Sequence, residues 1–499
     1  MKQRFYVTTP IYYVNDKPHV GHAYTTILAD VLARFHRTAQ EDVFFLTGLD
    51  EHGQKVLQAA KQRNLSPQQH CDDLAPRFLE LWKKLAIGYS DFVRTTEDRH
   101  KKIVQKILQE VYDKGDIYPD EYEGWYSVAE ERFITDKEKD SGQFRDVKQL
   151  KEKNYFFKMS KYQQKLIDYI KSHPKFIQPE HRRNEVLGFL QQPLGDLCIS
   201  RPKSRMDWGI EIPFDKDYVT YVWFDALINY ISIPGYGSDE KKFKTWWPAD
   251  VHLIGKDILT THAVYWPTML FSIGIDLPET IFAHGWWLTG DAKMSKSLGN
   301  VVNPLDLIEQ YGVDAVRYYL MREMVLGQDA NFTVDSFIKR FNSDLANDFG
   351  NLLNRVSGLI NKNFDGNIPQ EGKLTDAEKS VVDLAGKLHE QVRAQVIAYR
   401  VQDAIEEILK LVRLVNGYIE KQAPWKVAKE NLNRAGTILY TAAEALRISA
   451  ISLSPVMPEK TAVVLDILSA HGTKPKWGEL KAGTKLKSHE ALFPRIETK

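Results

Sequence analysis

Two short clusters of polar residues in this chain could bind phosphate groups. The first is His19, Gly21 and His22 in the run His-Val-Gly-His, and the second is Lys293 and Lys296 in the run Lys-Met-Ser-Lys-Ser. Imidazole and ammonium groups both donate hydrogen bonds to phosphate oxygens. Donors that meet negative charge as it develops stabilise a transition state more than the ground state. Together the clusters indicate transfer of a nucleotidyl group, in which phosphate oxygens gain charge.

Each cluster also has a simpler explanation. Histidines in such a run can cap a helix, and lysines and serines in a loop are usually only solvated. Short motif matches also arise by chance. For the first cluster alone helix capping is favoured, and for the second the two interpretations are balanced. Their joint occurrence in this order favours a shared phosphate site.

Strands that alternate with helices are predicted around the first cluster. Residues 5–14 alternate aromatic, β-branched and small side chains, as a strand does, and residues 22–37 carry an apolar stripe at helical spacing. Residues 43–46 and 54–63 repeat the pair, which is typical of parallel βαβ units. His19 then lies where a strand ends and a helix begins. Doubly wound sheets bind ligands at that edge, and a helix N-terminus favours phosphate.

A charged, irregular stretch interrupts the pattern from about residue 115 to 213. The strand pattern resumes at residues 219–224, 251–254 and 281–288, and residues 345–469 have apolar side chains at helical spacing. The sequence therefore predicts an α/β fold. We expect a Rossmann-like, doubly wound parallel sheet split by an inserted connective domain and followed by an all-α helix bundle.

The composition excludes several classes of protein. The chain has 499 residues, enough for about three or four domains, and a net charge of +1, which gives no overall basic field for RNA. Its only cysteines, Cys71 and Cys198, exclude a disulfide framework and an all-cysteine zinc site. The longest apolar stretch, near residues 263–275, is too short to cross a bilayer. The strand pattern begins too close to Met1 for a signal peptide, so a cytoplasmic protein is expected.

Two further segments make the sequence more specific. Residues 221–230 read Tyr-Val-Trp-Phe-Asp-Ala-Leu-Ile-Asn-Tyr, and residues 255–266 begin Gly-Lys-Asp-Ile and carry His262 and Trp266. With the two phosphate clusters, which match the HIGH and KMSKS signatures, they resemble the methionyl-tRNA synthetases, a family of class I aminoacyl-tRNA synthetases. The resemblance runs over nearly the whole chain.

The resemblance implies roles for individual residues. A thioether is favoured near aromatic ring edges, although such aromatic residues more often belong to a core. Asp50 would pair with the substrate ammonium group, and Leu227 replaces a proline of some relatives. Methionine would be bound by Ile11, Tyr13, Asp50, Trp223, Ala226, Leu227, Tyr230, Ile258, His262 and Trp266. ATP would be bound by His19, Gly21, His22, Gly255, Asp257, Lys293 and Lys296, with His19, His22, Lys293 and Lys296 catalytic.

An RNA-binding face is implied in the helical region. Asn351 and Arg355 lie four residues apart and share a helical face, and Trp425 follows Pro424 between two helical patterns. By resemblance these three residues read the CAU anticodon, in keeping with RNA recognition by stacking and base-edge hydrogen bonds. The simpler interpretation is a helix cap and a core tryptophan.

The resemblance also implies cofactors, partners and domain limits. Many relatives carry zinc knuckles in the insertion, but no cysteine lies between Cys71 and Cys198, so we expect a knuckle remnant without zinc or another structural metal. ATP would be used with Mg²⁺, and the partners would be methionine and tRNA(Met), with no membrane. Some relatives dimerise through an extra C-terminal domain that is not seen here, so a monomer is expected. The expected domains are residues 1–115 and 214–290 (catalytic halves), 116–213 (insertion), 291–344 (KMSKS loop and stem contact) and 345–499 (anticodon binding).

The implied reaction is methionine–tRNA ligation, which supports initiation and elongation of translation. Methionine and ATP would give methionyl-adenylate and pyrophosphate, and the methionyl group would pass to the 3′-terminal adenosine of tRNA(Met). An enzyme for leucine, isoleucine or valine is disfavoured because the insertion is too small for an editing domain. A cysteine enzyme would need a zinc ion in its pocket. A nucleotidyl-transferring enzyme without a tRNA role and an inactive RNA-binding paralogue are two further possibilities.

Overall fold

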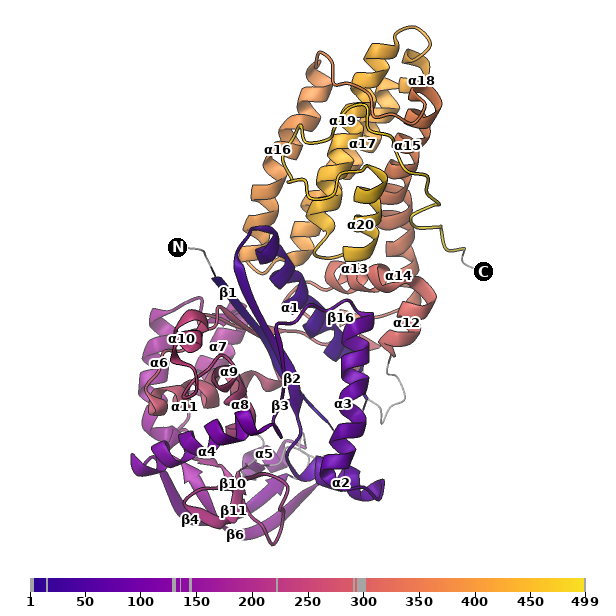
Figure 1. Cartoon of the computed structure of the whole chain (residues 1–499). Helices are drawn as coiled ribbons and strands as arrows, with labels where there is room; N and C mark the ends of the chain where they lie inside the picture. Colours follow the sequence, from indigo (N-terminus) through magenta and orange to yellow (C-terminus); the bar gives the residue numbers. More distant parts are fainter. Residues whose placement is uncertain are drawn as a thin grey trace. The chain divides into compact units, whose positions relative to one another are not determined.

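In the computed structural model the chain folds into two compact units (Figure 1). The first unit comprises residues 1–83 and 87–285, and the second comprises residues 84–86 and 286–499. The residues that the structure describes are 4–14, 17–127, 132–134, 136–142, 146–220, 223–289, 292–293 and 302–497.

A six-stranded sheet forms the centre of the first unit. All its neighbouring strands are parallel, and their order is β3-β2-β1-β12-β13-β7. The order reverses between β1 and β12, which makes the carboxyl ends of these two strands the topological switch point, where open α/β sheets bind ligands. The predicted doubly wound parallel sheet is confirmed. The strands are β1 (Arg4–Tyr13), β2 (Asp42–Asp50), β3 (Asp91–Arg94), β7 (Ile177–Gln178), β12 (Val251–Gly255) and β13 (Ile281–His284).

Helices cover both faces of this sheet (Figure 1). The apolar stripe of α1 packs on β1, β2 and β12, while α4 and α11 contribute side chains such as Val104 and Leu270 to a core that also contains Ile254. The first predicted strand–helix–strand run is therefore present as β1, α1 and β2. The helices of this part are α1 (Val20–Thr38), α2 (Gln54–Gln62), α3 (Pro67–Lys84), α4 (Asp98–Asp113), α8 (Trp223–Leu227), α9 (Asn229–Ser232), α10 (Glu240–Trp246) and α11 (Trp266–Ile273).

The insertion forms two antiparallel sheets of its own, β5-β4-β6-β8 and β10-β11-β9, and it also supplies β7 to the edge of the main sheet. One prediction was wrong here, because residues 219–224 do not form a strand of the main sheet. Part of that run is in β11, and α8 follows it. The insertion comprises β4 (Ile117–Ser127), β5 (Arg132–Ile134), α5 (Asp136–Asp140), β6 (Val147–Phe157), α6 (Gln163–Ser172), α7 (Glu180–Phe189), β8 (Leu197–Cys198), β9 (Ser200–Pro202) and β10 (Ile210–Ile212). The strand β11 (Asp215–Thr220), which completes the second of its sheets, follows the predicted limit at residue 213.

The second unit begins with a small sheet of order β15-β14-β16 and continues as helices. The predicted strand at residues 281–288 is in fact two strands, because β13 ends at His284 and β14 belongs to this small sheet. In the helix bundle α17 packs against both α16 and α19, as predicted for an all-α region. The elements are β14 (Trp287–Thr289), β15 (Ala292–Lys293), α12 (Pro304–Tyr311), α13 (Val313–Glu323), β16 (Ala330–Asn331), α14 (Val334–Arg340), a π-helical segment (Phe341–Gly350), α15 (Asn351–Phe364), α16 (Asp376–Ile397), α17 (Val401–Gln422), α18 (Pro424–Val427), α19 (Leu432–Leu453) and α20 (Pro458–Ile467).

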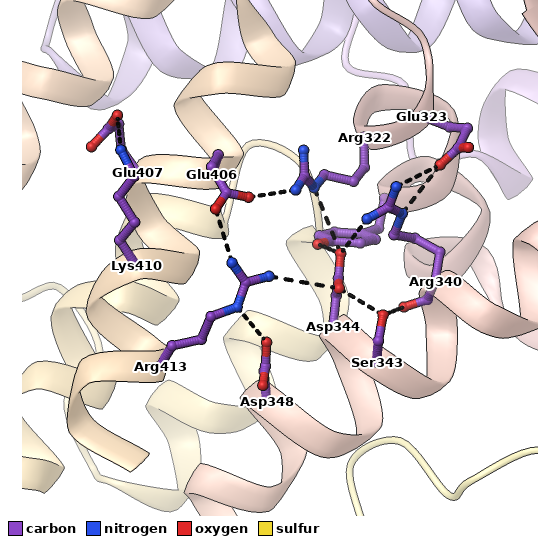
Figure 2. Close-up of polar contacts among 11 residues, drawn as sticks. Arg322, Glu323, Arg340, Ser343, Asp344, Asp348, Glu406, Glu407, Lys410 and Arg413 are labelled. Atoms are coloured by element: carbon purple, nitrogen blue, oxygen red, sulfur yellow. Dashed lines mark hydrogen bonds and ion pairs between the residues drawn. The ribbon is translucent and has the colours of Figure 1, made fainter. Parts of the chain in front are cut away.

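An ion-pair network joins four of these segments (Figure 2). Its centre is the buried carboxylate of Asp344 on the π-helical segment, which faces guanidinium groups of α13, α14 and α17. Arg413 of α17 also pairs with Asp348 at 2.8 Å and with Glu406 at 2.8 Å. The network therefore fixes α17 against the segment that leads into α15. Among the helices that the structure describes, none combines the length and the apolar character needed to cross a membrane.

Candidate active site and RNA-binding face

The first predicted phosphate cluster caps α1 at the switch point of the sheet. His19 is the N-cap residue, and its Nδ1 accepts a hydrogen bond from the Gly21 backbone N–H at 3.1 Å. His22 Nδ1 accepts from the His19 backbone N–H at 3.2 Å, and the two rings stack with centroids 3.9 Å apart. The capping interpretation of these histidines is therefore correct as far as it goes.

Capping does not exclude phosphate binding, because it uses only one nitrogen of each ring. A neutral imidazole that accepts at Nδ1 carries its proton on Nε2. In His19 and His22 the group that could donate to an anion is therefore Nε2–H, beside a helix N-terminus, which favours anions. Gly21 is needed for this arrangement, because a Cβ atom there would lie 2.9 Å from Cε1 of His19. Both histidines and the glycine are half-buried.

The second half of the predicted ATP site follows the neighbouring strand β12. Gly255 ends that strand, and a Cβ atom there would lie 2.5 Å from the Asp257 carboxylate in the next turn. Thr25 of α1 links this side to the first cluster, since its hydroxyl oxygen lies 3.2 Å from the Gly21 carbonyl and 2.7 Å from Nε2 of His284. His284 ends β13, and burial lowers its pKa. Neither Thr25 nor His284 was predicted from the sequence; a histidine at the carboxyl end of a strand was the available signal.

The β1 and β2 members of the predicted methionine site are adjacent. Ile11 pairs with Gly48 and Tyr13 pairs with Asp50 across the two parallel strands, after a register shift at residues 8–11. Asp50 is only 4% exposed. A buried carboxylate at the carboxyl edge of the sheet is suited to bind a cationic group, because the attraction is stronger away from water.

Tyr230 and His262 form a buried pair on the other side of this region. His262 lies in a π-helical turn (Thr261–Tyr265), a feature that often marks functional sites. Its Nδ1 donates to the Ile258 carbonyl oxygen at 3.0 Å, so its Nε2 accepts from the Tyr230 hydroxyl at 2.8 Å. Burial lowers the pKa of His262 to about 4, so the ring is neutral near pH 7. A neutral ring suits an apolar ligand.

A second buried histidine supports the same aromatic group. Trp266 donates its indole N–H to Nε2 of His252 at 3.3 Å, and Nδ1 of His252 lies 2.8 Å from the Thr8 hydroxyl. Tyr230 stacks on His252 with centroids 4.2 Å apart. Burial lowers the pKa of His252 well below its usual value, and the nearby His262 lowers it further. His252 was missed from the sequence because a lone histidine within a strand carries no motif.

The remaining predicted pocket residues line the same region. Trp223 and Tyr13 both pack against the small buried cluster that contains Met206. Trp223, Ile11 and Ile258 are partly buried against the main core, which includes Leu227, Tyr230 and Trp266. Ala226 is buried, and its carbonyl accepts a 2.6 Å hydrogen bond from Asn229.

The second phosphate cluster is largely outside the described residues. Lys293 is described only as the last backbone position of β15, and Lys296 lies outside the described part of the chain. The structure therefore does not test the predicted meeting of the two clusters.

In the second unit the three predicted anticodon residues come together on one face. Arg355 of α15 lies over the ring of Trp425, with its guanidinium carbon 6.0 Å from the ring centroid. Arg355 also pairs with Glu420 of α17 at 2.7 Å and donates to the Asn416 carbonyl at 3.3 Å. Asn351 donates to the Asn416 side chain at 3.4 Å. Trp425 is half-buried, so it is not the core tryptophan of the simpler interpretation.

Two family models match the chain. The model of a family described as tRNA synthetases class I (M) matches residues 5–142 and 141–357, and the anticodon binding domain of methionyl tRNA ligase matches residues 368–499. The chain belongs to the class I methionyl-tRNA synthetases. This confirms the family expected from the sequence.

Individual methionyl-tRNA synthetases align with the chain from end to end. The methionine–tRNA ligase of Caldanaerobacter subterraneus subsp. tengcongensis is 45% identical over 511 residues, covering 100% of this chain and 80% of that protein. The Thermotoga maritima ligase is 44% identical over 514 residues, covering 99% and 81%. The Mycobacterium tuberculosis methionyl-tRNA synthetase in complex with methionyl-adenylate is 41% identical, with a TM-score of 0.95 over 99% of this chain and 100% of that one. Its apo form is 38% identical, with a TM-score of 0.87 over 100% and 99%.

Within the described ranges, no three or more His, Cys, Asp or Glu side chains are grouped so that they could hold a metal ion. Cys71 is buried, Cys198 is partly buried, and neither is in a disulfide. The absence of structural zinc remains a prediction.

Proposed function

We propose that this protein is a methionine–tRNA ligase that activates methionine with ATP and charges tRNA(Met). The observation that supports this most strongly is the convergence of a capped phosphate cluster and a buried aromatic pocket at the switch point of one sheet. The helical unit adds a face suited to RNA, which a nucleotidyl-transferring enzyme without tRNA would not need.

In the first step, a carboxylate oxygen of methionine attacks the α-phosphorus of ATP. A new P–O bond forms, the bond to the bridging oxygen breaks, and pyrophosphate leaves with that electron pair. Nε2–H groups of His19 and His22 stabilise the charge that develops on the α-phosphate, and Lys293 and Lys296 stabilise the leaving pyrophosphate. Mg²⁺ enters with ATP as part of the substrate. No side chain is needed as a nucleophile, so catalysis rests on positioning and electrostatics.

Gly255 and Asp257 hold the nucleoside part of ATP. Gly255 has no Cβ atom, so the ligand can approach the backbone at the end of β12. Asp257 is exposed in the following turn, where its carboxylate can accept hydrogen bonds from ribose hydroxyl groups. Gly21 allows a similar approach at the start of α1.

Methionine recognition combines one charge with an apolar pocket. The Asp50 carboxylate pairs with the substrate ammonium group. Tyr230, His262 and Trp266 surround the thioether, whose sulfur is polarizable and favoured beside ring edges. The neutral state of His262 is part of this specificity, because a charged ring would have to be desolvated against the apolar side chain.

In the second step, the methionyl group passes to the 2′-hydroxyl of the terminal adenosine of tRNA(Met), and AMP leaves. The anticodon is read by Asn351, Arg355 and Trp425, through stacking on the indole ring and hydrogen bonds to base edges. Arg355 must exchange or share its ion pair with Glu420 when RNA binds.

Amino-acid-dependent ATP–pyrophosphate exchange, without tRNA and with each of the twenty amino acids, tests the proposal. Exchange with methionine alone is expected. Exchange with a different amino acid would keep the class I chemistry but show that the pocket was misassigned. Absence of exchange with every amino acid would favour the inactive RNA-binding paralogue.

Three further points belong to the proposal. The insertion folds without zinc, and a stoichiometric zinc content in the purified protein would contradict this.

The enzyme is a cytoplasmic monomer. A dimer mass in light scattering would contradict it.

A further inference from the structure

A buried carboxylate that the reaction does not use lies behind the methionine pocket. Asp225 is 0% exposed and belongs to α8, between the pocket residues Trp223 and Ala226. Its Oδ2 lies 2.6 Å from Nδ1 of His52, and its Oδ1 lies 2.8 Å from Nε2 of His100. Both of its oxygens are therefore engaged by imidazole rings that come from different segments.

The two histidines connect Asp225 to separate parts of the first unit. His52 lies two residues after Asp50, just beyond the end of β2. His100 is on α4, and its Nδ1 lies 2.9 Å from the Ser232 hydroxyl. Although burial raises it, the two histidines hold the pKa of Asp225 below its ordinary value, so the carboxylate stays ionised.

The orientation of α8 shows why this contact matters for the pocket. Residues two positions apart on an α-helix point about 200° apart. Asp225 therefore points away from both Trp223 and Leu227, so it holds the side of α8 opposite these two pocket residues. His52 thus ties α8 to the segment that carries Asp50, and His100 ties it to α4.

The β2 side of this connection has hydrogen bonds of its own. The Glu51 carboxylate, between Asp50 and His52, accepts a 2.7 Å hydrogen bond from Arg94 and another from Thr96. The backbone N–H of Glu51 donates to the Thr95 hydroxyl. If Asp225 lost its partners, α8 could therefore shift relative to Asp50, because these hydrogen bonds hold the end of β2 independently of α8.

We propose that Asp225 is a positioning residue for methionine, which fixes the aromatic side of the pocket relative to the Asp50 carboxylate through His52 and His100. This role rests on the proposed function. None of the contacts described for Asp225 reaches His19, His22, Gly255 or Asp257. Its loss should therefore weaken methionine binding and leave ATP binding unchanged.

The test is Asp225→Asn, assayed by methionine-dependent exchange with rates normalised to the burst of methionyl-adenylate. The oxygen of the introduced amide can accept a hydrogen bond from one imidazole N–H. Its NH2 group then faces the other imidazole N–H, and two donors cannot form a hydrogen bond. We expect the KM for methionine to rise about tenfold or more, as small displacements in a site do, with the KM for ATP within about twofold. Equal rises in both KM values, or an unchanged KM for methionine, would overturn the role.

A matched control is Asp116→Asn. Asp116 is also buried and hydrogen-bonded, to Lys161 at 2.6 Å and to Ser272 at 2.8 Å. It lies where the insertion begins, and Ser272 is near the end of α11, whereas the pocket residue Trp266 is at its start. Its loss should change neither KM. A methionine effect as large as that of Asp225→Asn would show that any buried carboxylate matters equally, and would overturn the proposal.

Paired histidine variants keep the test decisive if Asp225→Asn does not fold. His100→Gln and His52→Asn retain a donor N–H near the original position, whereas His100→Leu and His52→Leu remove it. The amide variants should keep a near wild-type KM for methionine and the leucine variants should not. Equal values within each pair would overturn the role. Failure of the proposed function would instead appear in the wild-type protein, as exchange that does not depend on methionine.

Discussion

The two candidate recognition sites of this protein are built in opposite ways. The aromatic side of the candidate methionine site in the first unit consists of neutral, buried groups, namely Tyr230, His262 and Trp266. The face of the second unit is half-exposed and ion-paired, with Arg355 between Trp425 and Glu420, and the charged network of Figure 2 fixes its supporting helix. Burial favours selection of a small apolar side chain, whereas exposed charge and stacking favour a polyanion. The two sites should therefore respond differently to substitution, pH and salt.

The largest expected effect is on the rate of the chemical step and not on either recognition site. Lys296→Ala should lower the rate of methionine activation by about 10²–10³-fold, since it removes one group that stabilises developing charge. The KM for methionine should stay within about twofold, because the pocket is intact. Single-turnover formation of methionyl-adenylate measures both quantities. A large loss of methionine affinity with an unchanged rate would contradict the role of Lys296.

The next effect concerns the RNA-binding face alone. Trp425→Ala should lower kcat/KM for charging of tRNA(Met) by about 10–100-fold, because base stacking on an aromatic ring contributes about 1–3 kcal/mol. Exchange without tRNA should be unchanged. Trp477→Ala is the matched control, since Trp477 is another half-buried tryptophan of the second unit and bonds to Glu371 instead. Equal charging defects in both variants would show that Trp425 is only structural.

Lys296 and Trp425 were both identified from sequence motifs. Much of the fold could also be predicted from the sequence. Alternation and helical spacing predicted β1, α1, β2 and the helix bundle, because each period reflects one buried face. The same signal failed at residues 219–224, because a period of two identifies a strand but not its partner strand. It also merged β13 with β14, since Gly285 and Trp286 do not interrupt the apolar pattern enough to separate them.

The site residues that were predicted lie within sequence motifs. The residues that form hydrogen bonds behind them could not be predicted. The bond from Thr8 to His252 joins residues 244 positions apart, and the bond from His52 to Asp225 joins residues 173 apart. A lone histidine has the same sequence appearance whether it is exposed or buried. Its burial, tautomer and partner depend on tertiary packing, which no local pattern records.

A third prediction tests the pocket by removing one atom. Tyr230→Phe deletes the hydroxyl that donates to His262 and leaves a buried ring nitrogen without that donor. Such a group costs about 1–3 kcal/mol, so we expect the free energy of unfolding to fall by that amount and the KM for methionine to rise about tenfold. Urea unfolding and exchange kinetics measure these, and tRNA(Met) binding should not change. An unchanged KM would mean that the pair does not border the ligand.

A fourth prediction uses pH to distinguish the two units. Unfolded His262 takes up a proton near pH 6.5, but the folded ring does so only near pH 4. Its contribution to stability is therefore complete above pH 6.5 and is lost as the pH falls toward 4, by about 2 kcal/mol at pH 5. In the second unit, burial raises the pKa of Glu378, but Arg434 and other hydrogen-bond donors lower it further, to about 2. That contribution is complete above pH 4.5 and is lost only as the pH falls toward 2.

Urea unfolding of the wild type and of two variants at pH 7.5 and pH 5 measures the difference. Between these pH values the wild type should lose stability relative to His262→Gln, but not relative to Glu378→Gln. Equal changes against both variants would remove the contrast between a neutral pocket and an ion-paired helical unit.

The smallest expected effect is the response to salt. An RNA face that uses cations releases counterions on binding, so the KM for tRNA(Met) should rise about threefold per phosphate contact when salt increases fourfold. Salt also screens the pair of Arg355 with the largely exposed Glu420, which should partly offset the rise. The KM for methionine should hardly change, because Asp50 is buried and screened little. Charging and exchange assays at the two salt concentrations measure both values. A methionine KM that rises as steeply as the tRNA KM would show that the ammonium group binds at an exposed carboxylate, and Asp50 would then be the wrong residue.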